Sequence, residues 1–118
     1  MNDSIPQRKI VTVLFYRESS GSEPVRKWLK SLSKENRKII GEDIKTVELG
    51  WPLGMPLVRN LGDGLWEVRS SIPNGIARVI FVMNKGAMVL LHGFIKKSQK
   101  TQADDLKIAR RRARNIED

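Results

Sequence analysis

Residues 65–83 of the chain, LWEVRSSIPNGIARVIFVM, place two β-strand patterns on either side of a turn. Leu65–Arg69 alternates between apolar and polar residues, and Ile76–Met83 is rich in β-branched residues, as is typical of strands. Pro73, Asn74 and Gly75 are residues favoured in tight turns. The stretch therefore predicts an antiparallel β-hairpin.

The length of the hairpin loop decides which charged side chains meet. Alternate residues of a strand share a face, so Glu67 and Arg69 are expected side by side. If the loop has two residues, either Pro73-Asn74 or Asn74-Gly75, Arg78 falls on that same face. A three-residue loop would separate Arg78 from Arg69. The two-residue loop, the more favoured of the two, gathers two guanidinium groups and one carboxylate on one face of the sheet.

Further strands and helices are predicted on both sides of the hairpin. The strand patterns lie at 10–16 and 87–95, and the second of these follows an Asn84-Lys85-Gly86 turn. Apolar residues at helical spacing predict one helix from Pro24 and a second from Ser33, its N-cap, to Gly50, together forming an αα-hairpin.

A third helix is expected at the C-terminal end of the chain. It follows a capping box, Thr101-Gln102-Ala103-Asp104, and has one apolar face. Its other face is basic and consists of Lys107, Arg110, Arg111, Arg112 and Arg114. The predicted fold is α+β in the order β-α-α-β-β-β-α, a mainly antiparallel sheet packed against the αα-hairpin and the C-terminal helix, in a single domain spanning 1–118.

Composition excludes several classes of chemistry. The 118 residues carry 22 Lys and Arg against 13 Asp and Glu, a formal net charge of +9 that favours a polyanionic partner. Without cysteine, and with His92 as the one histidine, the chain has no thiolate nucleophile and no multi-histidine metal site, so no metal or cofactor is expected. The N-terminal residues lack a signal-peptide pattern, which favours the cytoplasm.

Two interpretations of the Glu67, Arg69 and Arg78 cluster remain open. One is a salt-bridge network whose arginines extend to solvent. The other is an anion site, supported by Lys96, Lys97 and Lys100, which lead into the N-terminal end of the C-terminal helix. For the basic face of that helix, a solvated surface or a contact with an acidic protein is the preferred interpretation, and for His92 a structural hydrogen bond.

An arginine and lysine site has part of the chemistry needed to cleave RNA. Attack by a 2′-hydroxyl requires stabilisation of charge on the phosphate, a base and an acid. Arg69 and Arg78 provide the first. Lys96 and Lys97, crowded by positive charge, could transfer protons, and Glu67 could act as an orienting group or base. Such a site would be inefficient unless a host oriented the substrate.

Three segments resemble the RelE/HigB superfamily of toxins from type II toxin–antitoxin modules, especially its phage-derived branch. They are VRNLGDGLWEVR (58–69), IARVIFV (76–82) and LLHGFIKKSQKT (90–101). The resemblance implies a ribosome-dependent mRNA interferase, a metal-independent endoribonuclease that arrests growth. It also implies a cognate antitoxin, usually with a helix-turn-helix domain, as a partner besides the ribosome and mRNA.

The resemblance also implies roles for individual residues. Arg78 corresponds to the strand arginine on the scissile phosphate, Arg69 to a basic residue on the preceding strand, and Lys96 or Lys97 to the basic residue after the last strand. The expected RNA-binding residues are Arg59, Lys100 and Thr101. Thr101 stands near the place where some relatives have a catalytic tyrosine, and a plain N-cap is the preferred interpretation of it.

Related ParE proteins inhibit DNA gyrase on the same fold, so a gyrase inhibitor without nuclease activity remains an alternative. A non-catalytic module that binds RNA or the ribosome is a further alternative.

Overall fold

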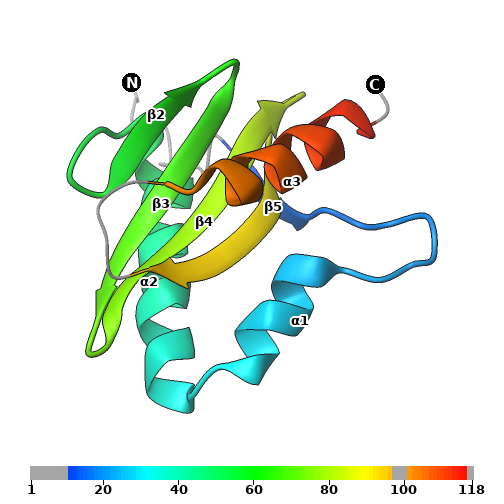
Figure 1. Cartoon of the computed structure of the whole chain (residues 1–118). Coiled ribbons are helices and arrows are strands. Elements are labelled where there is room, and N and C mark those ends of the chain that lie inside the picture. Colours follow the sequence, from blue (N-terminus) through cyan, green and yellow to red (C-terminus); the bar gives the residue numbers. More distant parts are fainter. Residues whose placement is uncertain (1–10, 97–100, 117–118) are drawn as a thin grey trace, which may run out of the picture.

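The fold is a five-stranded mixed β-sheet with helices on both faces (Figure 1). A computed structural model describes residues 11–96 and 101–116. The strands are β1 (Thr12–Phe15), β2 (Val58–Gly62), β3 (Leu65–Ile72), β4 (Gly75–Asn84) and β5 (Ala87–Lys96). The helices are α1 (Pro24–Ser31), α2 (Lys34–Gly50) and α3 (Ala103–Arg114). The strands lie in the order β1-β5-β4-β3-β2.

The expected α+β class is confirmed, but the expected order lacked one strand. β2 pairs antiparallel with β3 along the edge of the sheet, and its register shifts between Asn60 and Gly62. This strand is short and interrupted by residues that strands disfavour, so its hydrogen bonds to β3 stabilise it more than its own propensity does. The strand at the opposite edge, β1, runs parallel to β5, which makes the sheet mixed.

The central hairpin has the predicted two-residue loop. Ile72 pairs with Gly75, which leaves Pro73-Asn74 as the loop, and Arg69 lies directly opposite Arg78. Gly75 has a φ of +145°, and a Cβ at this position would lie 3.1 Å from the carbonyl oxygen of Lys96. The length of the loop is thus resolved, and both arginines belong to one face of the sheet.

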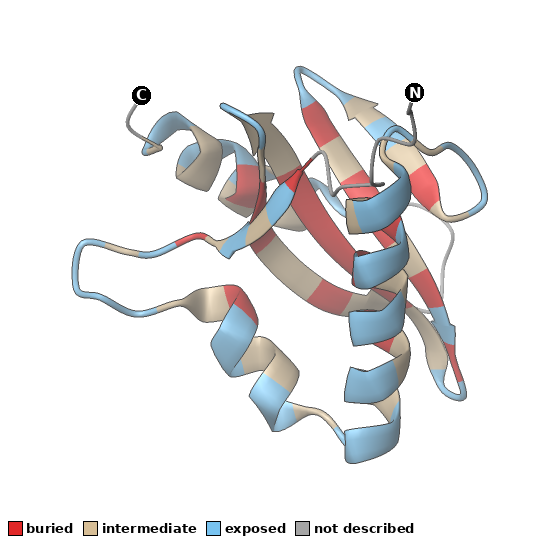
Figure 2. Ribbon diagram, turned by 180° about the vertical axis from the view of Figure 1, so that it is seen from behind, coloured by how far each residue is buried: buried red, intermediate tan, exposed pale blue. Residues whose placement is uncertain are grey.

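The first two helices cover the face of the sheet opposite to α3. The predicted cap of α2 is confirmed, since the Ser33 hydroxyl accepts a hydrogen bond from the backbone N–H of Asn36 at 3.1 Å. The two helices do not form a closely packed αα-hairpin, because α1 packs mainly on β5 and α2 on β3, and they diverge from their short connection (Figure 2). Each helix buries its apolar residues against the sheet rather than against the other helix.

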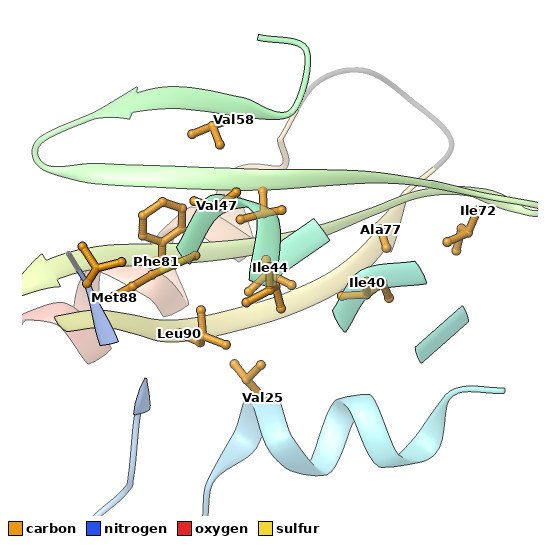
Figure 3. Packing of buried hydrophobic residues seen from close by; sticks show 13 residues of the cluster. Val25, Ile40, Ile44, Val47, Val58, Ile72, Ala77, Phe81, Met88 and Leu90 are labelled. Carbon is orange, nitrogen blue, oxygen red and sulfur yellow. The ribbon is translucent and has the colours of Figure 1, made fainter. Parts of the chain in front are cut away.

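The core has one layer on each side of the sheet. In the first layer, Val25 of α1 and Ile40, Ile44 and Val47 of α2 lie against buried residues of the strands such as Phe81 (Figure 3). Three tryptophans, Trp28, Trp51 and Trp66, are partly buried against this layer. The second layer is smaller and joins the sheet to Ala109 of α3. None of the described helices is both long enough and apolar enough to cross a membrane.

The start of α3 differs from the predicted capping box. The N-cap is Gln102, and no side chain caps the helix there. The preceding Thr101 is buried and directs its hydroxyl to the sheet instead. The capping prediction was wrong because a buried carboxylate and guanidinium on β3 and β4 bind the hydroxyl group that the helix end would otherwise use.

Arg112 also departs from the prediction, because it does not belong to the exposed face of α3. Its guanidinium donates a hydrogen bond to the carbonyl oxygen of Leu91 at 2.7 Å and lies 3.6 Å from the carboxylate of Glu18. Burial lowers the pKa of Arg112, and Glu18 opposes that shift. Arg112 therefore connects α3 by a hydrogen bond to β5 and by an ion pair to the segment after β1.

Candidate anion-binding site

A group of basic side chains shares the face of the sheet on which α3 lies. Arg59 pairs with Glu67 across β2 and β3, Arg69 pairs with Arg78 across β3 and β4, and Lys96 pairs with Ile76 across β4 and β5. Paired residues direct their side chains to the same face. We call Arg59, Arg69, Arg78 and Lys96 the basic cluster; Glu67 is the carboxylate among them.

Glu67 is the centre of a buried network. Its Oε2 accepts a hydrogen bond from the Thr101 hydroxyl at 2.6 Å, and its Oε1 lies 3.6 Å from Nη1 of Arg78 and 3.8 Å from Nε of Arg69. Nη1 of Arg78 in turn donates a hydrogen bond to the Thr101 hydroxyl at 3.2 Å. Residues from β3, β4 and the start of the α3 region are thereby joined around one carboxylate.

The exposure of the two arginines differs from the predicted extension to solvent. The side chains of Glu67 and Arg78 are 0% exposed, and that of Arg69 is 10% exposed. Burial lowers the pKa of Arg78, and the negative charge of Glu67 opposes that effect. An arginine nevertheless stays charged at neutral pH because its ordinary pKa lies far above neutrality. The ion pairs of the first of the two open interpretations are therefore present, but they are buried instead of solvated.

Sequence reasoning gave no signal for the loop contact of Arg69. Nη1 of Arg69 lies 3.9 Å from the sulfur of Met55, which belongs to the loop between α2 and β2 and is 60% exposed. A short loop interrupted by Pro52, Gly54 and Pro56 has no periodicity from which its path over the sheet could be predicted. Met55 therefore adds an exposed apolar side chain next to the basic cluster.

His92 has the structural role that its strand context favoured. Its Nε2 donates a hydrogen bond to Oδ1 of Asp105 at 2.7 Å, and its ring stacks on Phe94 with the ring centroids 5.5 Å apart. Asp105 lies in the first turn of α3. The contact connects the N-terminal end of α3 to β5, close to the basic cluster.

The arginines of the basic cluster suit the site to an anion. Within residues 11–96 and 101–116, no three His, Cys, Asp or Glu side chains gather in a way that could hold a metal ion. Arginine guanidinium groups favour carboxylate and phosphate oxygens. Lys97 and Lys100, which the sequence also assigned to the site, lie outside the described residues.

The fold and the site together define a small α+β protein whose sheet carries a cationic surface beside its C-terminal helix. A family model described as Phage derived protein Gp49-like (DUF891) matches residues 27–114. The chain belongs to this family. A comparison with curated proteins finds no match. The matched region includes the hairpin, the basic cluster and α3.

Proposed function

We propose that this protein is the toxin of a type II toxin–antitoxin module and acts as a ribosome-dependent mRNA interferase of the RelE/HigB superfamily. The observation that carries the proposal is the basic cluster, in which residues from β2, β3, β4 and β5 place four cations on one sheet face. Membership of the phage-derived Gp49-like family supports it.

The cluster would bind the phosphate of the message and stabilise the charge that develops during cleavage. Arg69 and Lys96, which both retain some exposure, are the proposed direct contacts. Arg78 is held by Glu67 and Thr101 and has no exposed surface, so its own contact with phosphate requires the hydrogen bond to Thr101 to open. While that hydrogen bond is closed, Arg78 contributes its positive charge and holds Glu67 and Thr101 in place.

Glu67 is proposed as the orienting group and not as the base. It has no exposed surface, and both of its oxygens face hydrogen-bond donors or guanidinium groups. A base must reach the proton that it removes, directly or through one water. Proton transfer is therefore assigned to Lys96, the last residue of β5, and to Lys97, which follows it in the sequence.

RNA, the ribosome and an antitoxin are the proposed partners of this protein. Arg59 and Lys100 are assigned to RNA binding, and the reaction uses no metal. Thr101, also expected among the RNA-binding residues, is buried with its hydroxyl bonded to Glu67 and Arg78 and is assigned to positioning them. Because two arginines and a lysine provide charge but little alignment, the ribosome would supply the orientation of the message. The toxin is proposed to form a single domain over residues 1–118 and to act in the cytoplasm. There a cognate antitoxin with a helix-turn-helix domain would neutralise it.

The test is induction of the protein in a bacterial host with mapping of new mRNA 5′ ends. Wild type is compared with Arg69→Ala, Arg78→Ala and a control, Lys38→Ala, which removes an exposed cation from α2 on the opposite face of the sheet. The expected result is cuts at fixed codon positions in translated regions for the wild type and the control. Loss of these cuts in Arg69→Ala, with an unchanged melting temperature, would support the proposal.

The burial of Arg78 favours a second candidate, a gyrase inhibitor that cleaves no phosphodiester. The Arg78 guanidinium, which contacts Glu67 and Thr101, can have a purely structural role that stabilises the fold. Growth arrest without new 5′ ends, accompanied by inhibition of DNA supercoiling in a purified gyrase assay, would support this candidate and contradict the interferase.

A further inference from the structure

The strand β1 leaves one edge of the sheet open. It lies beyond β5 at the end of the sheet, and no other strand of the described part of the chain pairs with it (Figure 1). Thr12 and Tyr16 donate their backbone N–H groups to carbonyl oxygens of the β4–β5 turn and of β5. Because successive residues of a strand direct these groups to opposite sides, those of Val13 and Phe15 are directed outwards. The outer edge of β1 can therefore pair with one more strand.

This edge lacks several of the features that usually prevent such pairing. Proteins protect an edge strand with charged residues, with proline or with a bulge. The opposite edge strand, β2, contains Arg59 and a register shift. β1 is short, but its sequence TVLF has no charge and no proline, and its register with β5 is regular. An edge of this kind favours the addition of an extended segment.

A groove with an apolar floor lies beside this edge, on the face of the sheet that carries α3. Because α3 packs mainly on β4 and β5, the same face of β1 is left uncovered, and Leu14 is 49% exposed. Leu14, Val89 and Ile116 line a hollow of about 770 Å³, here called the β1 groove. A segment paired with β1 would direct every second side chain to this face, over Leu14.

The rim of the β1 groove is positively charged. Arg17 and Lys85 line it beyond opposite ends of β1, and Arg114 borders an adjoining hollow. Glu18 also lines the groove, but its carboxylate forms an ion pair with Arg112. Acidic side chains of a ligand would therefore be attracted to both ends of the strand.

Fold stability does not account for Lys85. Asn84 pairs with Ala87, so Lys85 and Gly86 form a two-residue turn. Lys85 has a φ of +51°, a left-handed conformation that asparagine adopts more readily than lysine does. The turn thus carries a cation at a cost in stability, which favours a role for Lys85 in binding.

These features favour an acidic segment of a partner protein over other occupants. A nucleic acid has no peptide N–H and C=O groups that could pair with β1. A second copy of the chain would bring the same net charge of +9. Antiparallel pairing of two β1 strands would also place Arg17 of one copy near Lys85 of the other, and these like charges repel.

We propose that the β1 groove binds an extended, acidic segment of a partner protein, which joins the sheet as a strand beside β1 and packs apolar side chains over Leu14. This surface is separate from the basic cluster. β1 pairs with the first residues of β5, Ala87 to Leu90, whereas the cluster includes Lys96 at the other end of that strand. The proposal therefore does not rest on the proposed function.

The test follows backbone amide hydrogen exchange of the full-length protein by NMR, with and without a ten-residue peptide in which Glu and Val alternate. One control peptide has Lys in place of Glu, and a second has the Glu–Val sequence with every backbone nitrogen methylated, so that it cannot pair as a strand. The Glu–Val peptide should slow exchange at Val13 and Phe15 at least tenfold. Exchange at Thr12 and Tyr16, which already bond across the sheet, should stay unchanged, and neither control peptide should slow exchange.

Variants locate the binding surface. Leu14→Gln and Lys85→Asn should each bind the Glu–Val peptide at least fivefold more weakly than wild type in fluorescence anisotropy. The matched controls Leu49→Gln and Lys38→Gln remove an exposed leucine and an exposed cation from α2, on the opposite face, and should bind as wild type does. Lys85→Asn should also raise the melting temperature, because asparagine suits the turn, so its weaker binding would not reflect a damaged fold.

Three results would overturn the proposal. Equal binding of the methylated peptide would show attraction by charge alone. Slow exchange at Val13 and Phe15 without any peptide would show that the edge is already covered, by the chain itself if sedimentation finds a monomer or by a second copy if it finds a dimer. Unchanged exchange at both residues with the Glu–Val peptide would show that β1 does not accept a further strand.

Discussion

Replacing Glu67 by glutamine is expected to lower the free energy of unfolding by about 3–5 kcal/mol, because it leaves the charge of Arg78 buried and uncompensated. Both side chains are 0% exposed, so water cannot replace the missing carboxylate. Unfolding of 118 residues has an entropy of about 250 cal/mol/K near 60 °C, so this loss corresponds to a melting temperature lower by about 12–20 °C.

The assay is thermal and urea unfolding followed by circular dichroism, at one protein concentration and pH 7. The matched control is Glu23→Gln, which removes a carboxylate that pairs with Arg17 and Arg26 at the surface and should leave the melting temperature nearly unchanged. The double variant Glu67→Gln, Arg78→Met removes both charges and should regain much of the stability. A single variant Glu67→Gln that melts within about 3 °C of wild type would refute the reasoning.

Three further outcomes are expected. Gly93→Ala should destabilise the protein by about 1–3 kcal/mol in urea unfolding, because the added Cβ would overlap the indole of Trp28. An unchanged unfolding midpoint would contradict this, since it would show that α1 can shift away from β5 at little cost in free energy. Ser33→Ala should cost about 1 kcal/mol in the same assay through loss of the α2 cap, and Ser33→Asp should not. Hydrogen bonding to Arg26 lowers the pKa of the Glu23 carboxyl below its ordinary 4.5, so the stabilisation from this pair is present above pH 4.5 and is lost as the pH falls through the lowered value. An NMR titration should show Arg26→Gln moving that pKa back up, and an unmoved value would contradict the assignment.

Patterns of residues close together in the sequence were sufficient to predict most of the strands and helices. Period-two alternation and turn residues predicted β3 and β4, and apolar residues at helical spacing predicted α1 and α2 together with the Ser33 cap. These signals are readable because each depends on residues close together in the chain. The face shared by Glu67, Arg69 and Arg78 was also predictable, since it follows from the parity of a two-residue loop.

Contacts between distant segments decided the remaining features. β2 forms because β3 offers a hydrogen-bonding partner, which a five-residue edge segment does not reveal by itself. The Thr101 hydroxyl bonds Glu67, 34 residues earlier in the chain, instead of capping α3. Arg112 is directed to the carbonyl oxygen of Leu91 and the carboxylate of Glu18 instead of to solvent. The sequence by itself therefore determined which charges share the sheet face, and only the tertiary structure decided which of them are buried, because burial depends on what α3 and the loops place over each side chain.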